Sequence, residues 1–368
     1  MSLKLNANKF FVHVDYGSRG NSGLYISKII NSLKKETDFK AYVHKDYIYN
    51  DKNIVKIFDL LVFNIRPKFL QQILKLLSLS ICLFYISVSL AMTSRKDKYL
   101  IIELYEPFSI YKYFIKLSNF LGIETILTVH DVEPLYNNYP KIIMCDIADI
   151  ILCSKKLIVH THESYKKLEK YKKEIFHIPF PLMEIDKKDI SDAKENEIKF
   201  LFIGHLRKEK GIEILLNAWR SNSKIYNQSH LTIAGSVPFG LQYDFSNLKN
   251  CTLISDYIDD ETYSNLVNET HYVLLPYTAG TNSGILSTVA SLGKPCITSD
   301  LEMFKESSFL IGELVRKIKN SDDLEDILLS VIKNHDLKYN YYKDCVMDSV
   351  NKYEKDFCNI LNDAYHSF

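Results

Sequence analysis

The feature that most constrains the fold is an alternation of short β-rich runs with amphipathic helical stretches along most of the chain. In the first half this pattern predicts strands at 10–14, 98–105, 124–130 and 156–160. Helical periodicity between them predicts helices over 22–33, 108–121 and 163–173. Strands and helices that alternate in this way are typical of a parallel sheet covered by helices on both faces.

A second series of the same kind follows a polar, charged linker between Ile185 and Glu197. It predicts strands at 198–203, 230–235, 251–255, 271–276 and 295–299, with helices over 211–221, 260–269 and 284–292. The strand-like runs are too short to be buried helices. The tail from Tyr339 to Phe368 has a helical pattern.

A chain of 368 residues is longer than one hydrophobic core usually supports. We therefore predict an α/β protein of two Rossmann-like lobes, with parallel sheets facing across an interdomain cleft. The first lobe is expected over 1–185 and the second over 186–345. A C-terminal helix over 346–368 is expected to cross back to the first lobe.

Composition excludes some partners and suggests a compartment. Lys and Arg number 46 and Asp and Glu 45, so the charges nearly cancel and no nucleic-acid partner is expected. The seven cysteines are scattered and form no C-x-x-C pair, which indicates reduced thiols and a cytoplasmic protein. No signal peptide is expected, because the apolar run at 10–12 soon meets Asp15.

The stretch from Leu76 to Met92 is almost free of charge and is near the lower length limit for a bilayer span. Serines at 78, 80, 87 and 89 dilute its apolar character, and strand-like segments continue on both sides. We favour a helix that is buried or lies at an interface in the first lobe. A true span and a peripheral membrane helix are the alternatives.

The most informative segment joins a strand to a helix through a glycine turn and a basic loop. Gly204 ends the strand, Arg207 and Lys210 follow in the loop, and Gly211 opens the helix. Ligands of open parallel sheets bind at the carboxyl ends of strands, and two cations beside a helix start suit a diphosphate. The alternative is a solvated charged turn.

A second segment, rich in small and polar residues, lies between the strand at 271–276 and the next helix. Thr281, Asn282, Ser283 and Gly284 offer hydroxyl and backbone N–H groups to an anion at the helix start. Thr281 and Ser283 could instead be simple N-caps. The two segments reinforce each other because they end two strands of one lobe.

In the first lobe a glycine-bearing loop contains Gly17, Gly20 and Gly23, which permit close approach of a ligand to the backbone. Their spacing is not G-x-G-x-x-G, so a dinucleotide site is not supported, and a flexible surface loop is the alternative. His130 ends another strand and could donate a hydrogen bond or a proton to a sugar. A lone histidine is more often structural.

Other polar groups are not assigned to chemistry. The pairs Asp259-Asp260 and Asp322-Asp323 are interpreted as helix caps that favour the positive end of the dipole. His160 and His162 lack the spacing and carboxylate company of a metal site. No metal site is therefore predicted.

Together these segments resemble the GT-B glycosyltransferases, and within them the retaining family often called family 4. The match is clearest over 198–299. The resemblance implies that Gly204, Arg207, Lys210 and Gly211 hold the donor diphosphate.

The resemblance also assigns further residues to the donor site. Gly235, Tyr257 and Ile258 correspond to the nucleotide-base pocket. His130 corresponds to a histidine near the donor sugar, and the loop from Gly17 to Gly23 corresponds to a glycine turn that faces the phosphates.

This chain departs from the family pattern at three positions. His205 stands where many members carry a basic residue. Gly280 and Thr288 stand where most members carry two glutamates, the first contacting the donor sugar and the second the ribose. Thr288 is therefore the candidate at the ribose position, and the missing glutamates leave sugar identity open.

The resemblance implies transfer of a hexosyl unit from a UDP- or GDP-sugar to a hydroxyl acceptor, with retention of configuration. The expected acceptor is a glycan or a lipid-linked saccharide in cell-surface polysaccharide or glycoconjugate synthesis. No cofactor or metal is expected, because cations would stabilise the leaving diphosphate. A nucleotide-sugar epimerase and a non-catalytic nucleotide-sugar-binding subunit are the alternatives.

Overall fold

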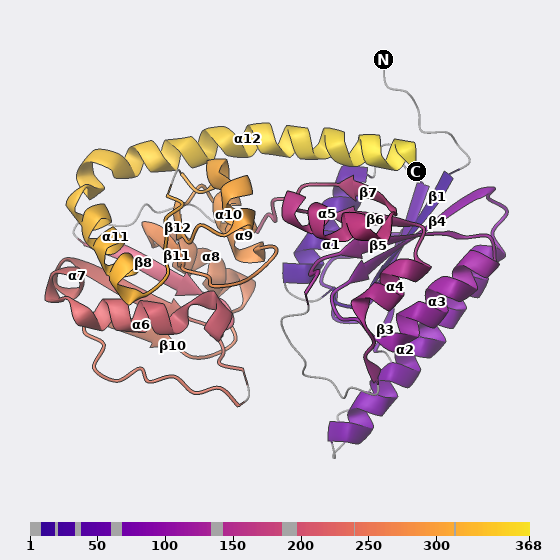
Figure 1. Ribbon diagram of the computed structural model, residues 1–368, viewed down its shortest axis with the longest axis horizontal. Helices are drawn as coiled ribbons and strands as arrows, with labels where there is room; N and C mark the ends of the chain where they lie inside the picture. The colour runs from indigo at the N-terminus through magenta and orange to yellow at the C-terminus, as the bar shows by residue number, and fades with distance from the viewer. Residues whose placement is uncertain are drawn as a thin grey trace. The chain divides into compact units, whose positions relative to one another are not determined.

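The chain forms two compact units, which are described here from a computed structural model (Figure 1). Unit 1 comprises Met1–Pro181 and Phe357–Phe368, and unit 2 comprises Leu182–Asp356. The structure describes residues 9–18, 21–33, 38–59, 68–133, 143–185, 197–238, 240–312 and 314–368.

Unit 1 is built on a seven-stranded sheet with the order β3-β2-β1-β4-β5-β6-β7. The strands are β1 (Lys9–Asp15), β2 (Asp38–His44), β3 (Ile54–Phe58), β4 (Asp97–Leu104), β5 (Glu124–Val129), β6 (Lys156–Val159) and β7 (Glu174–His177). All neighbouring pairs are parallel, so the carboxyl ends of the strands meet at one edge.

Helices cover the sheet of unit 1 and close its core. They are α1 (Asn21–Leu33), α2 (Lys68–Ala91), α3 (Ser109–Phe120), α4 (Ile147–Cys153) and α5 (His162–Leu168), with a short 3-10 turn, η2 (Glu169–Tyr171). Buried residues of α2, α3 and α4 form one hydrophobic cluster with alternate residues of the strands, such as Val12, Val14 and Ile102. This alternation follows from the period of two in a strand, which sends successive side chains to opposite faces.

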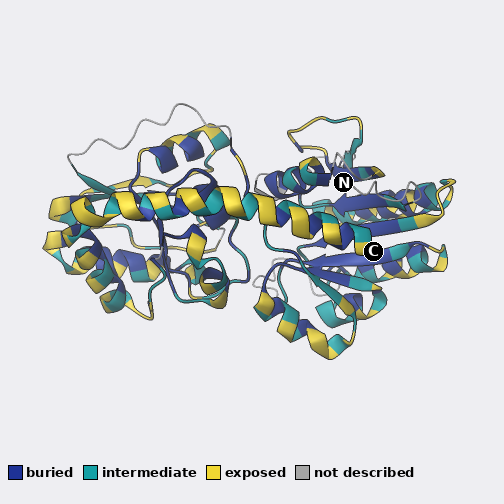
Figure 2. Ribbon diagram, turned by 90° about the horizontal axis from the view of Figure 1, so that it is seen from above, coloured by how far each residue is buried: buried dark blue, intermediate teal, exposed yellow. Residues whose placement is uncertain are grey.

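The end of the chain belongs to unit 1. The helix α12 (His335–Ser367) begins in unit 2, shows exposed residues along its length (Figure 2), and ends against β1 and β4. The Tyr365 hydroxyl lies 3.1 Å from His13 Nε2, and Tyr99 donates to the Phe368 carbonyl at 2.6 Å. The Phe11 ring contacts those of Tyr99 and Tyr365. The terminal residues therefore complete the core of unit 1.

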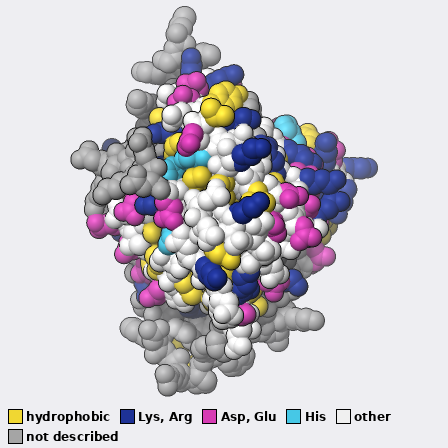
Figure 3. All heavy atoms as spheres, turned by 90° about the vertical axis from the view of Figure 1, so that its left-hand side faces the viewer, with side chains coloured by type: hydrophobic (Ala, Val, Ile, Leu, Met, Phe, Trp, Pro, Cys, Tyr) yellow, Lys and Arg dark blue, Asp and Glu magenta, His cyan; other side chains and the backbone are white. Residues whose placement is uncertain are grey.

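Unit 2 is built on a five-stranded parallel sheet with the order β10-β9-β8-β11-β12. Its strands are β8 (Ile198–Ile203), β9 (Ser229–Ala234), β10 (Cys251–Ile254), β11 (Tyr272–Leu275) and β12 (Cys296–Thr298). Its helices are η3 (Lys208–Lys210), α6 (Ile212–Ser221), α7 (Ser223–Gln228), α8 (Asp260–Asn268), α9 (Gly284–Ser291), α10 (Glu302–Glu306), η4 (Ser308–Leu310) and α11 (Ser321–Lys333). Acidic and basic side chains are mixed over the face of this unit where α7 and α11 lie (Figure 3).

The predicted α/β class with two parallel sheets is confirmed. Two boundaries differ from the predicted ones, namely the end of the first lobe and the start of the last helix. Residues 182–185 pack with unit 2 because the Met183 backbone bonds to Ser287 and Ser291 of α9. The last helix begins at residue 335 rather than near 346, because α11 is followed directly by α12.

The two aspartate pairs that were interpreted as helix caps have different roles in the structure. Asp259 is the N-cap of α8, and its carboxylate accepts from the Thr262 N–H at 2.7 Å, as predicted. The prediction is wrong for α11, whose N-cap is Asn320. Asp322 and Asp323 lie in the first turn, where their charge still favours the positive end of the helix dipole.

Candidate functional site

Two glycines place the ends of β8 and β9 in direct contact. Gly204 has φ +114° and Gly235 has φ +143°, values that side chains rarely allow. A Cβ on Gly235 would lie 1.8 Å from the Gly204 carbonyl oxygen, and one on Gly204 would lie 2.5 Å from Ile285 Cδ1. Both positions require glycine, and Gly204 lies against the first turn of α9.

The basic loop after β8 is tied to the loop after β11. Gly211 adopts the left-handed conformation at φ +76°, and a Cβ there would lie 1.9 Å from the Pro276 carbonyl oxygen. The Thr278 N–H donates to the Glu209 carbonyl at 2.9 Å. The two segments singled out in the sequence therefore meet at one edge of the unit 2 sheet.

The side chains of the basic loop are not a uniformly solvated cluster. Arg207 and Lys210 are half-buried, whereas Lys208 between them is exposed. Lys210 Nζ lies 3.8 Å from the centre of the Tyr277 ring, a cation–π contact with the second loop. The surrounding protein and the positive charges of Arg207 and Lys210 lower the pKa of His205. Arg207 and Lys210 thus lie in one partly buried loop that contacts the second loop through Tyr277, which favours an anion site over a hydrated turn.

The small-residue loop ends in the start of α9. Ser283 is the N-cap, and its hydroxyl accepts from the Leu286 N–H at 3.1 Å. Ser283 and Thr281 are largely buried, and Asn282 is half-buried. This cap bonds the Leu286 N–H and does not use the N–H groups of Gly284 and Ile285, which belong to the first turn of α9 beside Gly204. Capping and anion binding are therefore compatible at this helix start.

Thr288, the candidate at the ribose position, lies inside α9. This residue is fully buried, and its hydroxyl donates to the Gly284 carbonyl at 2.9 Å. Its side chain therefore packs within unit 2. Gly280, at the other position without a glutamate, has φ +150° and lies beside Met303.

The remaining predicted residues of unit 2 lie after β10, at the same edge of the sheet. Tyr257 is 71% exposed, and its N–H donates to the Asp256 carboxylate at 2.7 Å. Ile258 is half-buried. An exposed aromatic ring at this edge is available for stacking, as expected of a base pocket.

The glycine loop of unit 1 is described only in part. Gly17 packs against Tyr105, where a Cβ would lie 2.7 Å from the ring. Ser18 is buried, and its hydroxyl donates to the Asp15 carbonyl and accepts from the His44 N–H. Gly20 lies outside the described residues.

His130 belongs to a buried polar cluster at the carboxyl edge of the unit 1 sheet. Its Nε2 donates to Glu103 Oε2 at 3.0 Å, and its ring stacks on Tyr105 with centres 4.2 Å apart. Glu103 Oε1 lies 3.7 Å from His13 Nδ1. Burial acts to raise the pKa of Glu103, but the hydrogen bonds and charges of both histidines lower it to about 2.

Burial shifts the pKa of two further groups of this cluster toward their neutral forms. His160 Nδ1 donates to the Ile178 carbonyl at 2.8 Å, and Tyr25 donates to His160 Nε2 at 3.2 Å. Burial, followed by the charge of His130, lowers the pKa of His160 to about 3. Burial and the negative charge of Glu103 raise the pKa of Asp15 well above its usual value.

Sequence reasoning found His130 but missed the rest of this cluster. His13 and Glu103 lie within strands, where the pattern alone suggests ordinary inward-facing positions. The sequence nevertheless contained a signal for this cluster, namely a charged or imidazole side chain in an otherwise apolar strand. Such a side chain needs a polar partner when it is buried.

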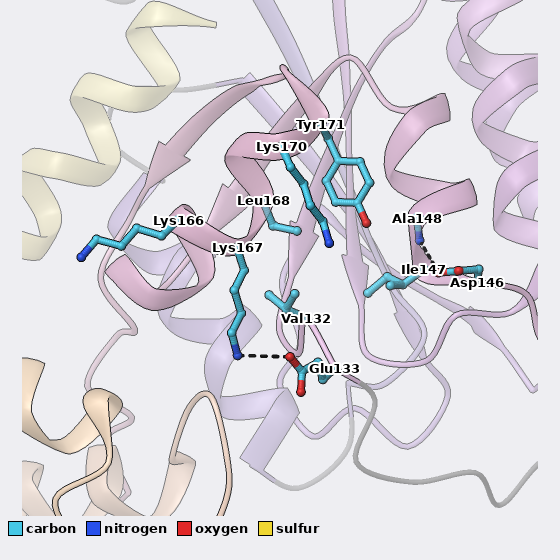
Figure 4. A pocket seen from close by; sticks show the side chains of 10 residues that line it. All are labelled: Val132, Glu133, Asp146, Ile147, Ala148, Lys166, Lys167, Leu168, Lys170 and Tyr171. Atoms are coloured by element: carbon cyan, nitrogen blue, oxygen red, sulfur yellow. Dashed lines mark hydrogen bonds and ion pairs between the residues drawn. The ribbon is translucent and has the colours of Figure 1, made fainter.

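A pocket of about 550 Å³ opens beside the same edge of unit 1 (Figure 4). It is lined by Val132, Glu133, Asp146, Ile147, Ala148, Lys166, Lys167, Leu168, Lys170 and Tyr171. Lys167 points to Glu133, with 3.3 Å between Nζ and the carboxylate, whereas Lys166 points away from the other lining side chains (Figure 4). Val132 and Glu133 follow His130 in the chain, so the pocket adjoins the polar cluster.

Residues 184–345 match the family Glycosyl transferases group 1. Comparison with curated proteins by sequence finds no match.

Several solved structures share the fold of this chain at low sequence identity. Sucrose-phosphate synthase (tll1590) from Thermosynechococcus elongatus is 12% identical over 98% of both chains, with a TM-score of 0.66. Anabaena HepE (Alr3699) in complex with UDP-glucose is 11% identical over 98% of this chain and 100% of that one, with a TM-score of 0.68. The E. coli trehalose-6-phosphate synthase bound with UDP-2-fluoro glucose is 10% identical over 97% and 98%, with a TM-score of 0.65.

The architecture is the GT-B fold of the glycosyltransferases, and residues 184–345, a little under half of the chain, are similar to the Glycosyl transferases group 1 family. The resemblance found in the sequence to the GT-B glycosyltransferases is thereby confirmed for the fold.

Proposed function

We propose that the protein transfers a hexosyl unit from a UDP- or GDP-sugar to a hydroxyl acceptor, with retention of configuration. The observation that carries this proposal is the meeting of the loops after β8 and β11, which places Arg207 and Lys210 at the same edge of the sheet as the start of α9. A diphosphate needs such a concentration of positive charge and N–H groups. UDP and UDP-glucose in the similar HepE structures support a nucleotide-sugar as donor.

The main catalytic task is to stabilise the negative charge that grows on the nucleoside diphosphate as the glycosidic bond breaks. Arg207 and Lys210 supply that stabilisation, together with the N–H groups at Ser283 and Gly284. These groups are held by the loop contacts before the reaction, so little reorganisation is required. We propose that no metal ion is needed, because the two cations perform this role.

Further residues are assigned to donor recognition. Gly204, Gly235 and Gly17 allow close approach of the donor to the backbone. Tyr257 and Ile258 contact the base, and Thr281 and Asn282 offer polar groups to the sugar. These assignments follow the resemblance together with the position of each residue at a carboxyl edge of its sheet.

We assign His130 to hydrogen-bond the transferred sugar through Nδ1, because its Nε2 donates to Glu103 and orients the ring. The pocket of Figure 4 adjoins this histidine and is our candidate for part of the acceptor site. The acceptor is proposed to be a glycan or a lipid-linked saccharide in cell-surface polysaccharide or glycoconjugate synthesis. The enzyme is proposed to act in the cytoplasm, peripherally at the inner face of the membrane.

Thermal unfolding in the presence of UDP, GDP and their sugars tests the donor site. A ligand at 100 times its dissociation constant stabilises by about 2.7 kcal/mol. We expect this stabilisation for UDP or GDP with the natural protein and its loss in Arg207→Ala and Lys210→Met. Lys208→Ala is the matched control, because this exposed lysine lies in the same turn and should leave the stabilisation unchanged.

Turnover separates binding from catalysis. Loss of one preorganised charge should lower turnover about 10²–10³-fold. If Arg207→Ala still bound the nucleotide as tightly as the natural protein, the placement of the diphosphate would be wrong. Tight UDP binding with neither transfer nor hydrolysis would instead identify a binding subunit.

A further inference from the structure

The outward side of α2 is apolar along the described part of the helix. Between Leu70 and Ala91 every residue that is exposed has an apolar or aromatic side chain. These residues are Leu70, Ile73, Leu77, Ile81, Phe84 and Tyr85. Most of them follow one another by three or four positions, so they share one side of the helix. A helix on a protein surface ordinarily turns polar residues toward water.

The serines of α2 do not interrupt this side. Ser78 and Ser87 are buried, and the Ser87 hydroxyl lies 3.0 Å from the Ser118 hydroxyl of α3. The Ser80 hydroxyl donates to the Leu76 carbonyl within the helix. Of the four serines that dilute the apolar stretch in the sequence, Ser78, Ser80 and Ser87 are therefore buried or bonded within unit 1.

The neighbouring helix α3, which packs beside α2 (Figure 1), also exposes apolar side chains. The exposed positions of α3 are Tyr113, Lys116 and Phe120, spaced by three and four residues. Tyr113 is 65% exposed and Phe120 is 87% exposed. We call the eight exposed apolar residues of α2 and α3 the apolar face. An exposed patch that spans two neighbouring helices marks an interaction site.

The topology decides how this face can meet a partner. By length and composition alone, the segment Leu70–Ala91 could cross a membrane. However, α2 connects β3 to β4 of one parallel sheet, and its inner residues Leu79, Leu83 and Ile86 lie in the core cluster. The helix therefore lies along the sheet, and only its outer side is available to a membrane.

Charge distinguishes a lipid surface from a second copy of the chain. The segments 68–96 and 109–120 contain no Asp or Glu but several cations. Arg95 and Lys112 bind Asp38 and Asp149, while Lys96 and Lys116 are exposed. A two-fold contact through this face would bring the same cations together without acids from either helix. Anionic lipid headgroups supply the missing negative charge.

We propose that the apolar face binds the surface of a phospholipid bilayer that contains anionic lipids. The side chains of the face enter the boundary between headgroups and acyl chains, and Lys96 and Lys116 lie against phosphates. Aromatic side chains and lysines are typical of that interface. The proposal does not rest on the transfer reaction, because lipid binding requires neither donor nor acceptor.

Flotation of the full chain with lipid vesicles tests this proposal. The vesicles are phosphatidylcholine alone and phosphatidylcholine mixed with phosphatidylglycerol. We expect Ile81→Glu/Phe84→Glu to lower binding to the mixed vesicles at least about tenfold, because two exposed apolar side chains no longer enter the lipid. Leu337→Glu/Tyr341→Glu is the matched control, since both residues are exposed apolar positions of α12 in unit 2.

A separate variant tests the electrostatic contribution to lipid binding. Lys116→Glu should lower binding to the mixed vesicles by about fivefold or more, with a smaller effect on phosphatidylcholine alone. Circular dichroism checks that each variant is folded, and Lys116→Glu alone carries the test if the double variant is not. Unchanged flotation of the folded variants would overturn the proposal. A natural dimer that Ile81→Glu/Phe84→Glu converts to a monomer, without vesicle binding, would also overturn it.

Discussion

His160 should make unit 1 sensitive to mild acid. This buried side chain is neutral, donates to the Ile178 carbonyl and accepts from Tyr25. Its pKa is lowered from 6.5 to about 3, mainly by burial. Between these values the unfolded chain binds a proton that the folded unit does not, so stability falls as the pH falls through this window.

The size of this effect follows from the two pKa values. At pH 5, which is 1.5 units below the unperturbed value, one such group costs about 2 kcal/mol at about 1.36 kcal/mol per unit. We expect the natural protein to lose this amount between pH 7 and pH 5. His160→Asn should be about 1 kcal/mol less stable at pH 7, because Tyr25 loses its acceptor, but should lack this acid-dependent loss.

Urea unfolding with a short deuterium pulse at a common pH measures each unit separately. Peptides from β6 report on unit 1, and peptides from β8 report on unit 2. The only tryptophan, Trp219, is buried in unit 2, so its fluorescence gives an independent reading of that unit. Equal losses of unit 1 stability in the natural protein and in His160→Asn would refute the reasoning.

Two other substitutions test the buried groups at the strand ends. Gly235→Ala places a Cβ 1.8 Å from the Gly204 carbonyl at positive φ and should destabilise unit 2 by about 3 kcal/mol or more in urea unfolding. Gly240→Ala is its control, with positive φ but open space, and should cost only about 1 kcal/mol. Glu103→Gln should lower unit 1 stability by about 3 kcal/mol at pH 7, because the pKa of Glu103 is lowered from 4.5 to about 2. This difference should shrink as the pH falls from 4.5 toward 2, and a constant difference in unfolding curves would contradict the assignment.

Local patterns predicted the five strands of unit 2 and the strands β1, β4, β5 and β6 of unit 1. The strand β8 has the predicted bounds, and β9, β11 and α9 differ by only one residue at either end. The strands β3 and β7 were missed, and both are edge strands of the unit 1 sheet. An edge strand has a neighbour on one side only, so its sequence needs less continuous apolar character. The central strand β2 was also missed, because Asp38 and Lys40 interrupt its apolar run.

The candidate site was predictable where its requirements are local. A glycine at the end of a strand, a basic loop and a helix start identified the segment from Gly204 to Gly211 without any tertiary information. The contact of Lys210 with Tyr277 depends on β8 and β11 being neighbours in the sheet, which no local pattern specifies. The burial of Thr288 likewise depends on which side of α9 faces the core.

The sequence by itself determined the α/β class, the glycine turns and the apolar character of α2, because period, φ preference and hydropathy are local properties. Only the tertiary structure decided which polar groups meet, since strand order brings His13, Glu103 and Tyr365 together from distant parts of the chain. It also decided which side of α2 is buried. When both sides of a helix are apolar, packing against the sheet selects the inner one and leaves the other to a partner.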